Sequence, residues 1–291
     1  MMEEKILFEK SLFWDGNAIT VDIEFYVDRI VMLPKIRPHQ LEKAVRLALE
    51  NWQMVDFRRK ILEKIYYCPA LIYQLFKRGA VEFGEIEPFL RNRDIFFLCY
   101  YFRKEIVDFA SFMQNKEKPN DFDCSFLENE NDVFQMIEYG FLPSSVEYIL
   151  KYDVIDDLIG LNNLNHEAKW SPFEWCSKPD CFDLLSFSGF FGSIKCFKHL
   201  LIKDFKINEQ TLSMIVCSGS LDLFHLFQGE QLLTAECICK ASEFFQLPLL
   251  VFMIENGANI NSKNKIVDLV LLIIVHFILL LKMAILVLLS F

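Results

Sequence analysis

A turn that recurs every 27 residues limits the possible folds of this chain more than any other feature. Gly192, Gly219 and Gln246 occupy equivalent positions, and each is expected to begin the short turn between two helices. The residues expected to open the second helices are Ile194, Leu221 and Pro248. One helix pair cannot bury its apolar faces alone, whereas stacked pairs share a continuous core. The recurrence therefore predicts an array of stacked helix pairs.

The composition favours helices over strands. Hydrophobic residues make up 53% of the chain and charged residues 24%, a balance typical of folded proteins and not of disordered ones. The 291 residues include only 10 glycines and 9 prolines, too few for a β-protein with many turns. We therefore expect an all-α protein.

Apolar residues at helical spacing also precede the recurrent turns. They extend through residues 40–65, 71–81 and 89–112, whereas the polar, acidic stretch 115–131 is expected to be a long loop. Gly79 ends the second of these segments, at a position where the residue after a helix often needs a positive φ. These patterns predict helices in the first half of the chain as well.

Several segments resemble parts of ankyrin repeats. Residues 136–142 (Met-Ile-Glu-Tyr-Gly-Phe-Leu) match 253–259 (Met-Ile-Glu-Asn-Gly-Ala-Asn) in the spacing of Met, Ile, Glu and Gly. Residues 170–173 (Trp-Ser-Pro-Phe) resemble the Thr-Pro-Leu-His start of an ankyrin first helix, in which the hydroxyl caps the helix and Pro occupies its first turn. Together these units are similar to the divergent ankyrin-like repeats of large protist protein families, including the eukaryotic ankyrin-like domain of unknown function.

The resemblance covers residues 170–264, is less complete over 60–165 and is absent over 1–34. Gln246 replaces a turn glycine, Asp204 replaces a terminal glycine, and no complete Thr-Pro-Leu-His occurs. The period is shorter than the ~33 residues of regular ankyrin repeats, so the hairpin between units is expected to be trimmed. The resemblance implies a degenerate ankyrin-type helical solenoid of stacked helix pairs, which binds other proteins and has no catalytic residues.

The sequence divides into four regions. Residues 1–34 stay unassigned, because 19–27 fit either a strand or the opening of a helix. Residues 35–165 are expected to form degenerate ankyrin-like repeats, and 166–264 to form clearer ones. Residues 265–291 make up an apolar tail.

The tail allows two interpretations, of which the first is a membrane anchor. Residues 266–291 form a run long enough to span a bilayer, which needs about 20 apolar residues. Lys282 interrupts the run, at a cost of about 3 kcal/mol on insertion scales, and no basic residues follow it. An anchor of this kind would be poorly built.

The second interpretation is a change of reading frame close to Asn264. If codons are chosen for Val275–Phe291 and read from the final base of each preceding codon, they can encode S-P-F-H-S-A-A-Q-D-G-H-L-G-V-V-E-F. This product resembles a regular ankyrin repeat and falls where the next repeat is due. We favour an out-of-frame repeat and a truncated array. Genomic DNA around codons 261–291 tests this, and the hypothesis fails if neither alternative frame encodes the repeat.

The net charge of −10 limits the partners that the chain can bind. Asp268 and Lys282 cancel within the tail, so the acidic excess lies in residues 1–265. Binding to nucleic acid requires clustered Lys and Arg, and carboxylates surround the short basic run at residues 58–60. We expect protein partners and no nucleic acid, with membrane contact only if residues 266–291 are an anchor.

The N-terminal residues Met-Met-Glu-Glu-Lys lack the features of a secretory signal. We therefore expect a cytoplasmic location, with anchoring through the tail as the alternative. In that location the nine cysteines should be reduced, and most lie among apolar residues as small core side chains do.

No arrangement of residues indicates an enzyme. Cys196 and His199 lie three residues apart on one expected helix, and Cys217 could pair with His225, but buried cysteines are usually inert. No phosphate loop, G-x-S-x-G or H-E-x-x-H motif occurs. We expect no catalysis and no cofactor.

A metal site is not expected either. Cys237-x-Cys239 and Cys176-x4-Cys181 lack the paired C-x2-C spacing of structural zinc sites. The acidic pair Asp156-Asp157 is expected to be a solvated helix end or turn.

Two tryptophans are candidates for partner binding. Trp170 and Trp175 would suit a binding hot spot, but packing in the core or at the edge of a repeat is favoured. The predicted function is a protein–protein interaction scaffold. The alternative is a tail-anchored membrane protein with a cytosolic ankyrin-like domain.

Overall fold

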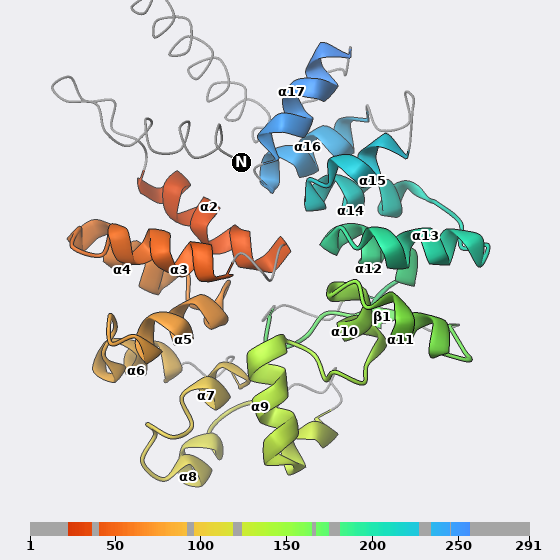
Figure 1. Cartoon of the computed structure of the whole chain (residues 1–291). Helices are drawn as coiled ribbons and strands as arrows, with labels where there is room; N and C mark the ends of the chain where they lie inside the picture. Colours follow the sequence, from red (N-terminus) through yellow and green to blue (C-terminus); the bar gives the residue numbers. More distant parts are fainter. Residues whose placement is uncertain are drawn as a thin grey trace, which may run out of the picture. The chain divides into compact units, whose positions relative to one another are not determined.

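The structure is a computed structural model that describes residues 23–36, 41–91, 96–118, 124–164, 167–174, 181–226, 234–244 and 246–256. These residues are predominantly helical, with one short two-stranded sheet among them (Figure 1). The prediction of an all-α protein is therefore confirmed. The chain divides into two compact units: unit 1 comprises Met1–Pro143 and Trp170–Asp180, and unit 2 comprises Ser144–Lys169 and Cys181–Phe291.

Unit 1 is built from helices that follow one another side by side. Its helices are α2 (Ile23–Ile36), α3 (Leu41–Glu50), α4 (Val55–Glu63), α5 (Pro69–Lys77), α6 (Phe83–Leu90), α7 (Leu98–Tyr101), α8 (Phe109–Met113) and α9 (Glu130–Tyr139), with a 3-10 helix at Ser125–Glu128. The odd-numbered helices α3, α5, α7 and α9 each pack against the next, and α2 packs against α3 and α4 (Figure 1).

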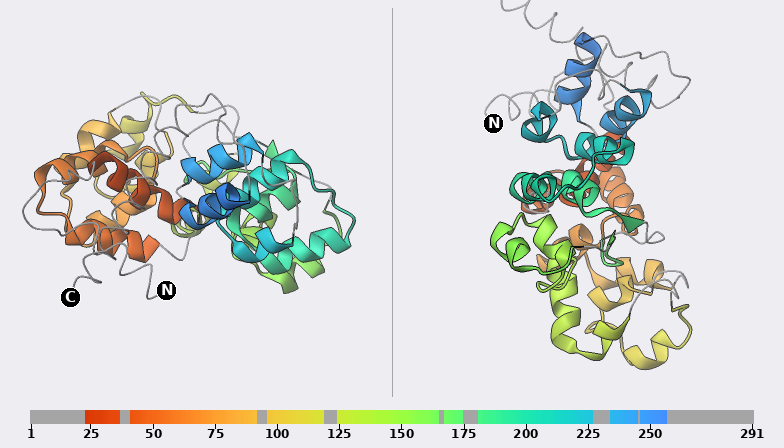
Figure 2. Two further views of the ribbon diagram at one scale, coloured as in Figure 1. Left: turned by 90° about the horizontal axis from the view of Figure 1, so that it is seen from above. Right: turned by 90° about the vertical axis from the view of Figure 1, so that its right-hand side faces the viewer.

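Unit 2 is a stack of helix pairs. Its helices are α10 (Val146–Lys151), α11 (Ile155–Gly160), α12 (Leu184–Phe191), α13 (Ile194–Ile202), α14 (Glu209–Ser218), α15 (Leu221–His225), α16 (Ala235–Glu243) and α17 (Leu247–Glu255). The first helices α10, α12, α14 and α16 pack in a row in sequence order, and each packs against the second helix that follows it. The right-hand view of Figure 2 shows these pairs one above another, from green to blue.

The recurrent turn takes the same form in two of the three expected units. Gly192 and Gly219 end α12 and α14 with φ values of 70° and 65°, in the left-handed region that a side chain disfavours. The second helices then open at Ile194 and Leu221, as expected. Gln246 differs, because it is the N-cap of α17 with a φ of −83° and needs no glycine. As a result α17 opens at Leu247, one residue before the expected Pro248.

Three residues that follow second helices of the expected pairs also have positive φ. Gly79 and Gly140 follow α5 and α9 with φ values of 71° and 82°. Asp204 follows α13 with a φ of 63°, so it occupies the position of the terminal glycine that it replaces. Aspartate is among the residues that tolerate this conformation best.

The expected helix start at residues 171–174 is not formed. Ser171 accepts a hydrogen bond from the N–H of Phe173 (3.1 Å) in a turn, after the strand β1 (Ala168–Lys169) and before β2 (Cys181–Phe182). The strands pair antiparallel, with Ala168 opposite Phe182. The first helix of this pair is α12, which starts after its N-cap Asp183. The prediction was wrong because the burial of Phe173 outweighed a favourable capping sequence.

Phe173 lies in an aromatic cluster of unit 1. Its side chain has no exposed surface, and the hydroxyl of Tyr101 donates to its carbonyl oxygen at 2.8 Å. The rings packed around it belong to Phe97 (5.6 Å), Tyr101 (5.7 Å), Phe126 (5.9 Å) and Tyr100 (6.5 Å). This cluster explains why residues 170–180 belong to unit 1, although both strands beside them belong to unit 2.

Two expected long helical segments are broken by turns. Within 40–65, Asn51 leaves the helix and its side-chain amide donates to the Leu47 carbonyl (2.8 Å), which ends α3. Within 89–112, the described residues form the end of α6, then α7 and α8, and α8 starts from Asp108 at a φ of 51°. The region boundary expected at residue 34 falls inside α2, so the helical part begins earlier. The interior of 115–131 contains the 3-10 helix at Ser125–Glu128.

Polar side chains link the starts of the stacked first helices in unit 2. Asp183 and Asn208 cap α12 and α14, accepting from the N–H groups of Ser186 (2.7 Å) and Thr211 (2.8 Å). The buried hydroxyls of Ser186 and Thr211 are 2.9 Å apart and share a hydrogen bond. Thr234 caps α16 in the same way. The pairs that begin with α12 and α14 are thereby joined by hydrogen bonds as well as by apolar contacts.

Asp183→Ala is expected to lower the free energy of unfolding by about 1 to 2 kcal/mol. The change removes the cap of α12 and an acceptor for the Ser186 hydroxyl (2.7 Å). Chemical denaturation of both proteins measures the effect. Asp183→Asn is the matched control, because it keeps a capping oxygen and should recover most of the loss. Equal losses for both variants would contradict this role of the cap.

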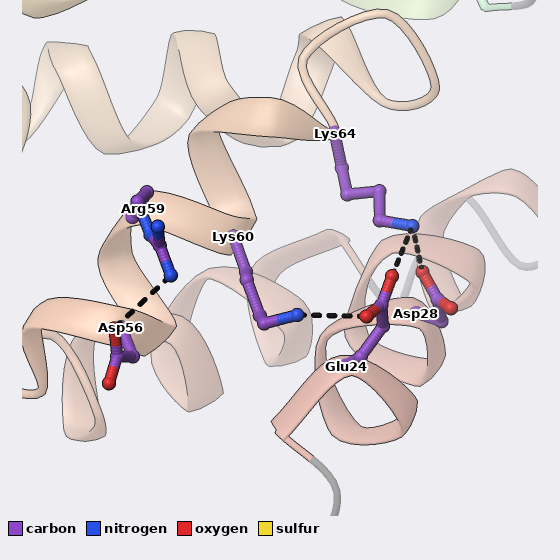
Figure 3. A network of polar contacts seen from close by, with 6 residues as sticks. All are labelled: Glu24, Asp28, Asp56, Arg59, Lys60 and Lys64. Carbon is purple, nitrogen blue, oxygen red and sulfur yellow. Dashed lines mark hydrogen bonds and ion pairs between the residues drawn. The ribbon is translucent and has the colours of Figure 1, made fainter.

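Ion pairs connect α2 to α4 in unit 1. Lys60 contacts Glu24 at 2.8 Å, and Lys64 contacts Asp28 at 2.8 Å and Glu24 at 3.9 Å (Figure 3). The hydrogen bond from Lys60, together with the charges of Lys60 and Lys64, lowers the pKa of Glu24 below its ordinary value. A lowered pKa in the folded state contributes stability above the unfolded-state pKa, and this contribution is lost as the pH falls.

Acidification is therefore expected to loosen α2 before α3. Below pH about 4, hydrogen-exchange protection of α2 should fall relative to that of α3, after correction for intrinsic exchange rates. Glu24→Gln should show reduced protection of α2 already at neutral pH and little further change on acidification. The same drop in both proteins would show that the Glu24 carboxylate is not responsible.

Candidate interaction surface

The first candidate nucleophile, Cys196, is poorly suited to catalysis. Its side chain is buried in α13, and its thiol lies 3.8 Å from the carbonyl oxygen of Ile149. Burial and the nearby Asp153 carboxylate raise the pKa of Cys196 to about 12, so the thiolate is disfavoured at neutral pH. His199 lies half-buried on the same helix.

The second candidate pair, Cys217 and His225, is divided between two helices. Cys217 is buried in α14, and burial raises the pKa of its thiol. His225 is exposed at the end of α15, where its ring lies 6.5 Å from that of Phe252. The side chain of Cys217 serves as a small core residue.

The remaining sequence candidates are divided between described and undescribed residues. Within the described ranges, no group of three or more His, Cys, Asp or Glu side chains is placed to hold a metal ion. Cys237 is buried in α16, and Cys239 is partly exposed. Asp156 and Asp157 lie exposed in the first turn of α11. Trp170 is buried, whereas Cys176, Trp175 and the tail 265–291 lie outside the described residues.

The basic run at residues 58–60 is paired with carboxylates. Arg58 contacts Glu85, Arg59 contacts Asp56 at 3.3 Å, and Lys60 contacts Glu24. Figure 3 shows the latter two pairs. The positive charges of this run are therefore locally compensated.

Burial separates the two rows of helices in unit 2. Every side chain of α12 is buried, whereas the second helices carry both buried and exposed residues. We define the second-helix surface as the exposed residues of α11, α13, α15 and α17 and of the turns that follow them. Its exposed large apolar residues are Ile159 (60% exposed), Ile202 (77%), Leu221 (48%), Leu226 (43%), Val251 (37%) and Phe252 (39%).

This surface is rigidly backed by the stack. Phe197 and Leu200 of α13 and Leu223 of α15 are fully buried, so each second helix is anchored on its inner side. The rings of Phe224 and Phe252 meet edge to face at 5.3 Å and join α15 to α17. The recurrent turn in the sequence predicted α13, α15 and α17 but not α11, and it did not show which of their apolar residues stay exposed.

The part of the chain that the structure describes contains no helix both long and apolar enough to cross a bilayer. In the comparisons with known proteins, no family model, curated protein or solved structure matches this chain.

Proposed function

We propose that the chain is a protein–protein interaction scaffold built from degenerate ankyrin-like helix pairs, located in the cytoplasm and without catalytic activity. The observation that supports this most is the row of first helices α10, α12, α14 and α16 in unit 2. Repeated pairs of this kind form a stack that presents an extended surface, which repeat proteins use to bind partners.

The ankyrin-like assignment rests on features shared between pairs. Residues with a positive φ end the first helices α12 and α14, at Gly192 and Gly219. Residues with a positive φ also follow the second helices α5, α9 and α13, at Gly79, Gly140 and Asp204. Capping side chains stand at the start of α12, α14 and α16. In this proposal the even-numbered helices are first helices in both units, although the packed row of unit 1 is formed by the odd-numbered helices α3, α5, α7 and α9.

Partner capture with surface variants tests the scaffold function. We would compare the full chain with two variants. The first combines Ile159→Glu, Ile202→Glu and Leu221→Glu on the second-helix surface, and the control combines Val55→Glu and Val107→Glu. All five residues are exposed, at 60%, 77%, 48%, 80% and 94%, so the fold should be kept, which circular dichroism checks. The same partner should be retained by wild type and control and lost by the first variant. A partner set unaffected by any variant, or no reproducible partner, would refute the function.

A tail-anchored membrane protein is the alternative, supported by the apolar run 266–291. Membrane fractionation of the chain with and without these residues separates the two proposals. An anchor requires that deletion releases the protein from the membrane fraction. Association that persists after deletion excludes it.

A further inference from the structure

Helix α13 presents a basic face to solvent and an apolar face to the stack. Lys195, Lys198 and Ile202 are exposed at spacings of three and four residues, which places them on one side of the helix. The opposite side carries the fully buried Phe197 and Leu200. The orientation of α13 is thus fixed by its core residues, and its lysines must face outward.

Two further exposed lysines follow the end of the helix. Lys203 is the C-cap of α13, and Lys206 lies exposed in the connection to α14. Ile202 is 77% exposed and Ile207 is 38% exposed. We define the α13 lysine surface as these four lysines together with the two isoleucines. A face that combines positive charge with accessible apolar groups is suited to binding and not only to solubility.

The lysines of this surface have no ion-pair partner within the described residues. Ten ion pairs occur there, and none includes Lys195, Lys198, Lys203 or Lys206. By contrast, Arg58, Lys60 and Lys64 of α4 and its following turn are all paired. Lys43, Lys104 and Lys118 of unit 1 also form none of these ion pairs, but those lysines are far apart in sequence, whereas the four lysines here all lie between residues 195 and 206.

Carboxylates also lie close to this surface in sequence or on a neighbouring helix, but none forms an ion pair with its lysines within the described residues. Asp153 accepts hydrogen bonds from the backbone N–H groups of Cys196 (2.8 Å) and Lys195 (3.2 Å), so it caps α13. Asp156 and Asp157 lie exposed on α11, which packs against α13. Asp204, Glu209 and Asp222 are also exposed but form none of the ion pairs above. The charges of the α13 lysine surface therefore remain available to a partner.

We propose that the α13 lysine surface binds an acidic segment of another protein that also carries apolar side chains. Charge complementarity identifies the partner class: carboxylates match the lysines, and one or two apolar side chains cover Ile202 and Ile207. This inference rests on the proposed scaffold function and names the chemistry of its partner.

An anionic membrane fits this surface less well. The apolar face of α13 is buried in the stack, so the helix cannot lay it into a bilayer as interfacial helices do. The net charge of −10 of the whole chain would also repel a flat anionic membrane. A short peptide, in contrast, interacts mainly with the charges within about 10 Å of it at moderate salt.

The test is selection of a displayed library of random 16-residue peptides on the full chain. The enriched peptides are synthesised, and their dissociation constants are measured by fluorescence anisotropy at low and high salt. The reversal variant combines Lys195→Glu, Lys198→Glu, Lys203→Glu and Lys206→Glu, and a neutral version uses Gln at the same four positions. The matched control reverses Lys43, Lys104 and Lys118, which are exposed lysines of unit 1.

Enrichment of peptides rich in Asp, Glu and large apolar residues is expected. Their affinity should fall at least about tenfold in the reversal variant, fall less in the Gln variant and in high salt, and be unchanged in the control. Asp156→Asn combined with Asp157→Asn should strengthen binding, because it removes negative charges beside the surface.

Other outcomes overturn the inference in distinguishable ways. Peptides that bind the reversal variant as tightly as the wild type would leave the scaffold function in place and refute this surface. If no peptide is enriched, both this inference and binding of short segments by the scaffold fail. If the wild type sediments with vesicles of phosphatidylcholine and phosphatidylserine and only the reversal variant does not, the surface binds a membrane instead. Self-association lost in the reversal variant would assign it to a second copy.

Discussion

Phe173→Ala is expected to lower the free energy of unfolding of unit 1 by about 3 to 5 kcal/mol. The Phe173 side chain has no exposed surface and is surrounded by four aromatic rings within 6.5 Å. Truncation removes its apolar contacts and leaves a cavity that rings on short elements such as α7 cannot refill. The hydrogen bond from Tyr101 goes to the backbone carbonyl, so it is not removed directly.

Hydrogen exchange in α5 and α7 measures this effect for unit 1 alone. Phe134→Ala is the matched control, because Phe134 lies in α9 of the same unit but is 57% exposed. The control should change the free energy by no more than about 0.5 kcal/mol. If both variants show similar losses, Phe173 is not part of the core of unit 1.

Gly219→Ala is expected to lower the free energy of unfolding by about 2 to 3 kcal/mol. Gly219 has a φ of 65°, where a side chain is strained, and a methyl group there would lie 2.0 Å from Oε1 of Gln246. The Gln246 side chain must move to relieve this clash. It would then lose the hydrogen bond from its Nε2 to the Cys217 carbonyl (2.7 Å), which links two successive turns.

Gly79→Ala separates the two causes. Gly79 has a similar φ of 71°, but a methyl group there would have no atom within 4 Å. It should therefore show only the backbone strain, about 1 kcal/mol. Chemical denaturation of both variants measures the difference, and Gly219→Ala combined with Gln246→Ala should lose the extra clash. Equal effects at both glycines would show that the contact with Gln246 does not matter.

The turns of the fold could be predicted because their causes are local. A glycine after an apolar helix predicts a positive φ, and Gly79, Gly140, Gly192 and Gly219 all have one. The same reasoning covers Asp204, which adopts a φ of 63°. The pairing of helices around Gly192 and Gly219 follows from these turns.

The failures depended on contacts between residues distant in sequence. Ser171-Pro172 is a favourable helix start, but burial of Phe173 against α7 holds it in a turn. The apolar segment 89–112 contains no sequence signal for a turn as clear as the acidic stretch 115–131 that follows it. A turn nevertheless separates α7 from α8, and Phe102 and Ile106, which lie between these helices, are both buried. Local periodicity cannot show which of several apolar faces will meet a neighbour.

The sequence predicted the helix that carries the α13 lysine surface but not the surface itself. The recurrent turn placed the start of a second helix at Ile194, where α13 begins. Two features of this surface could not be predicted from the sequence: the lysines form no ion pairs within the described residues, and Asp153 caps α13.

The position of Phe173 in the core of unit 1 affects how this protein can be synthesised and divided into fragments. During synthesis, α3 to α9 are made before Phe173, so the aromatic cluster of unit 1 stays incomplete until this later segment is added. Tyr101 and Phe173 are 72 residues apart, which makes this a late and slow contact to form. A fragment that ends at Pro143 would likewise lack its central ring. A fragment that ends at Asp180 would include this ring but would also carry residues 144–169 of unit 2.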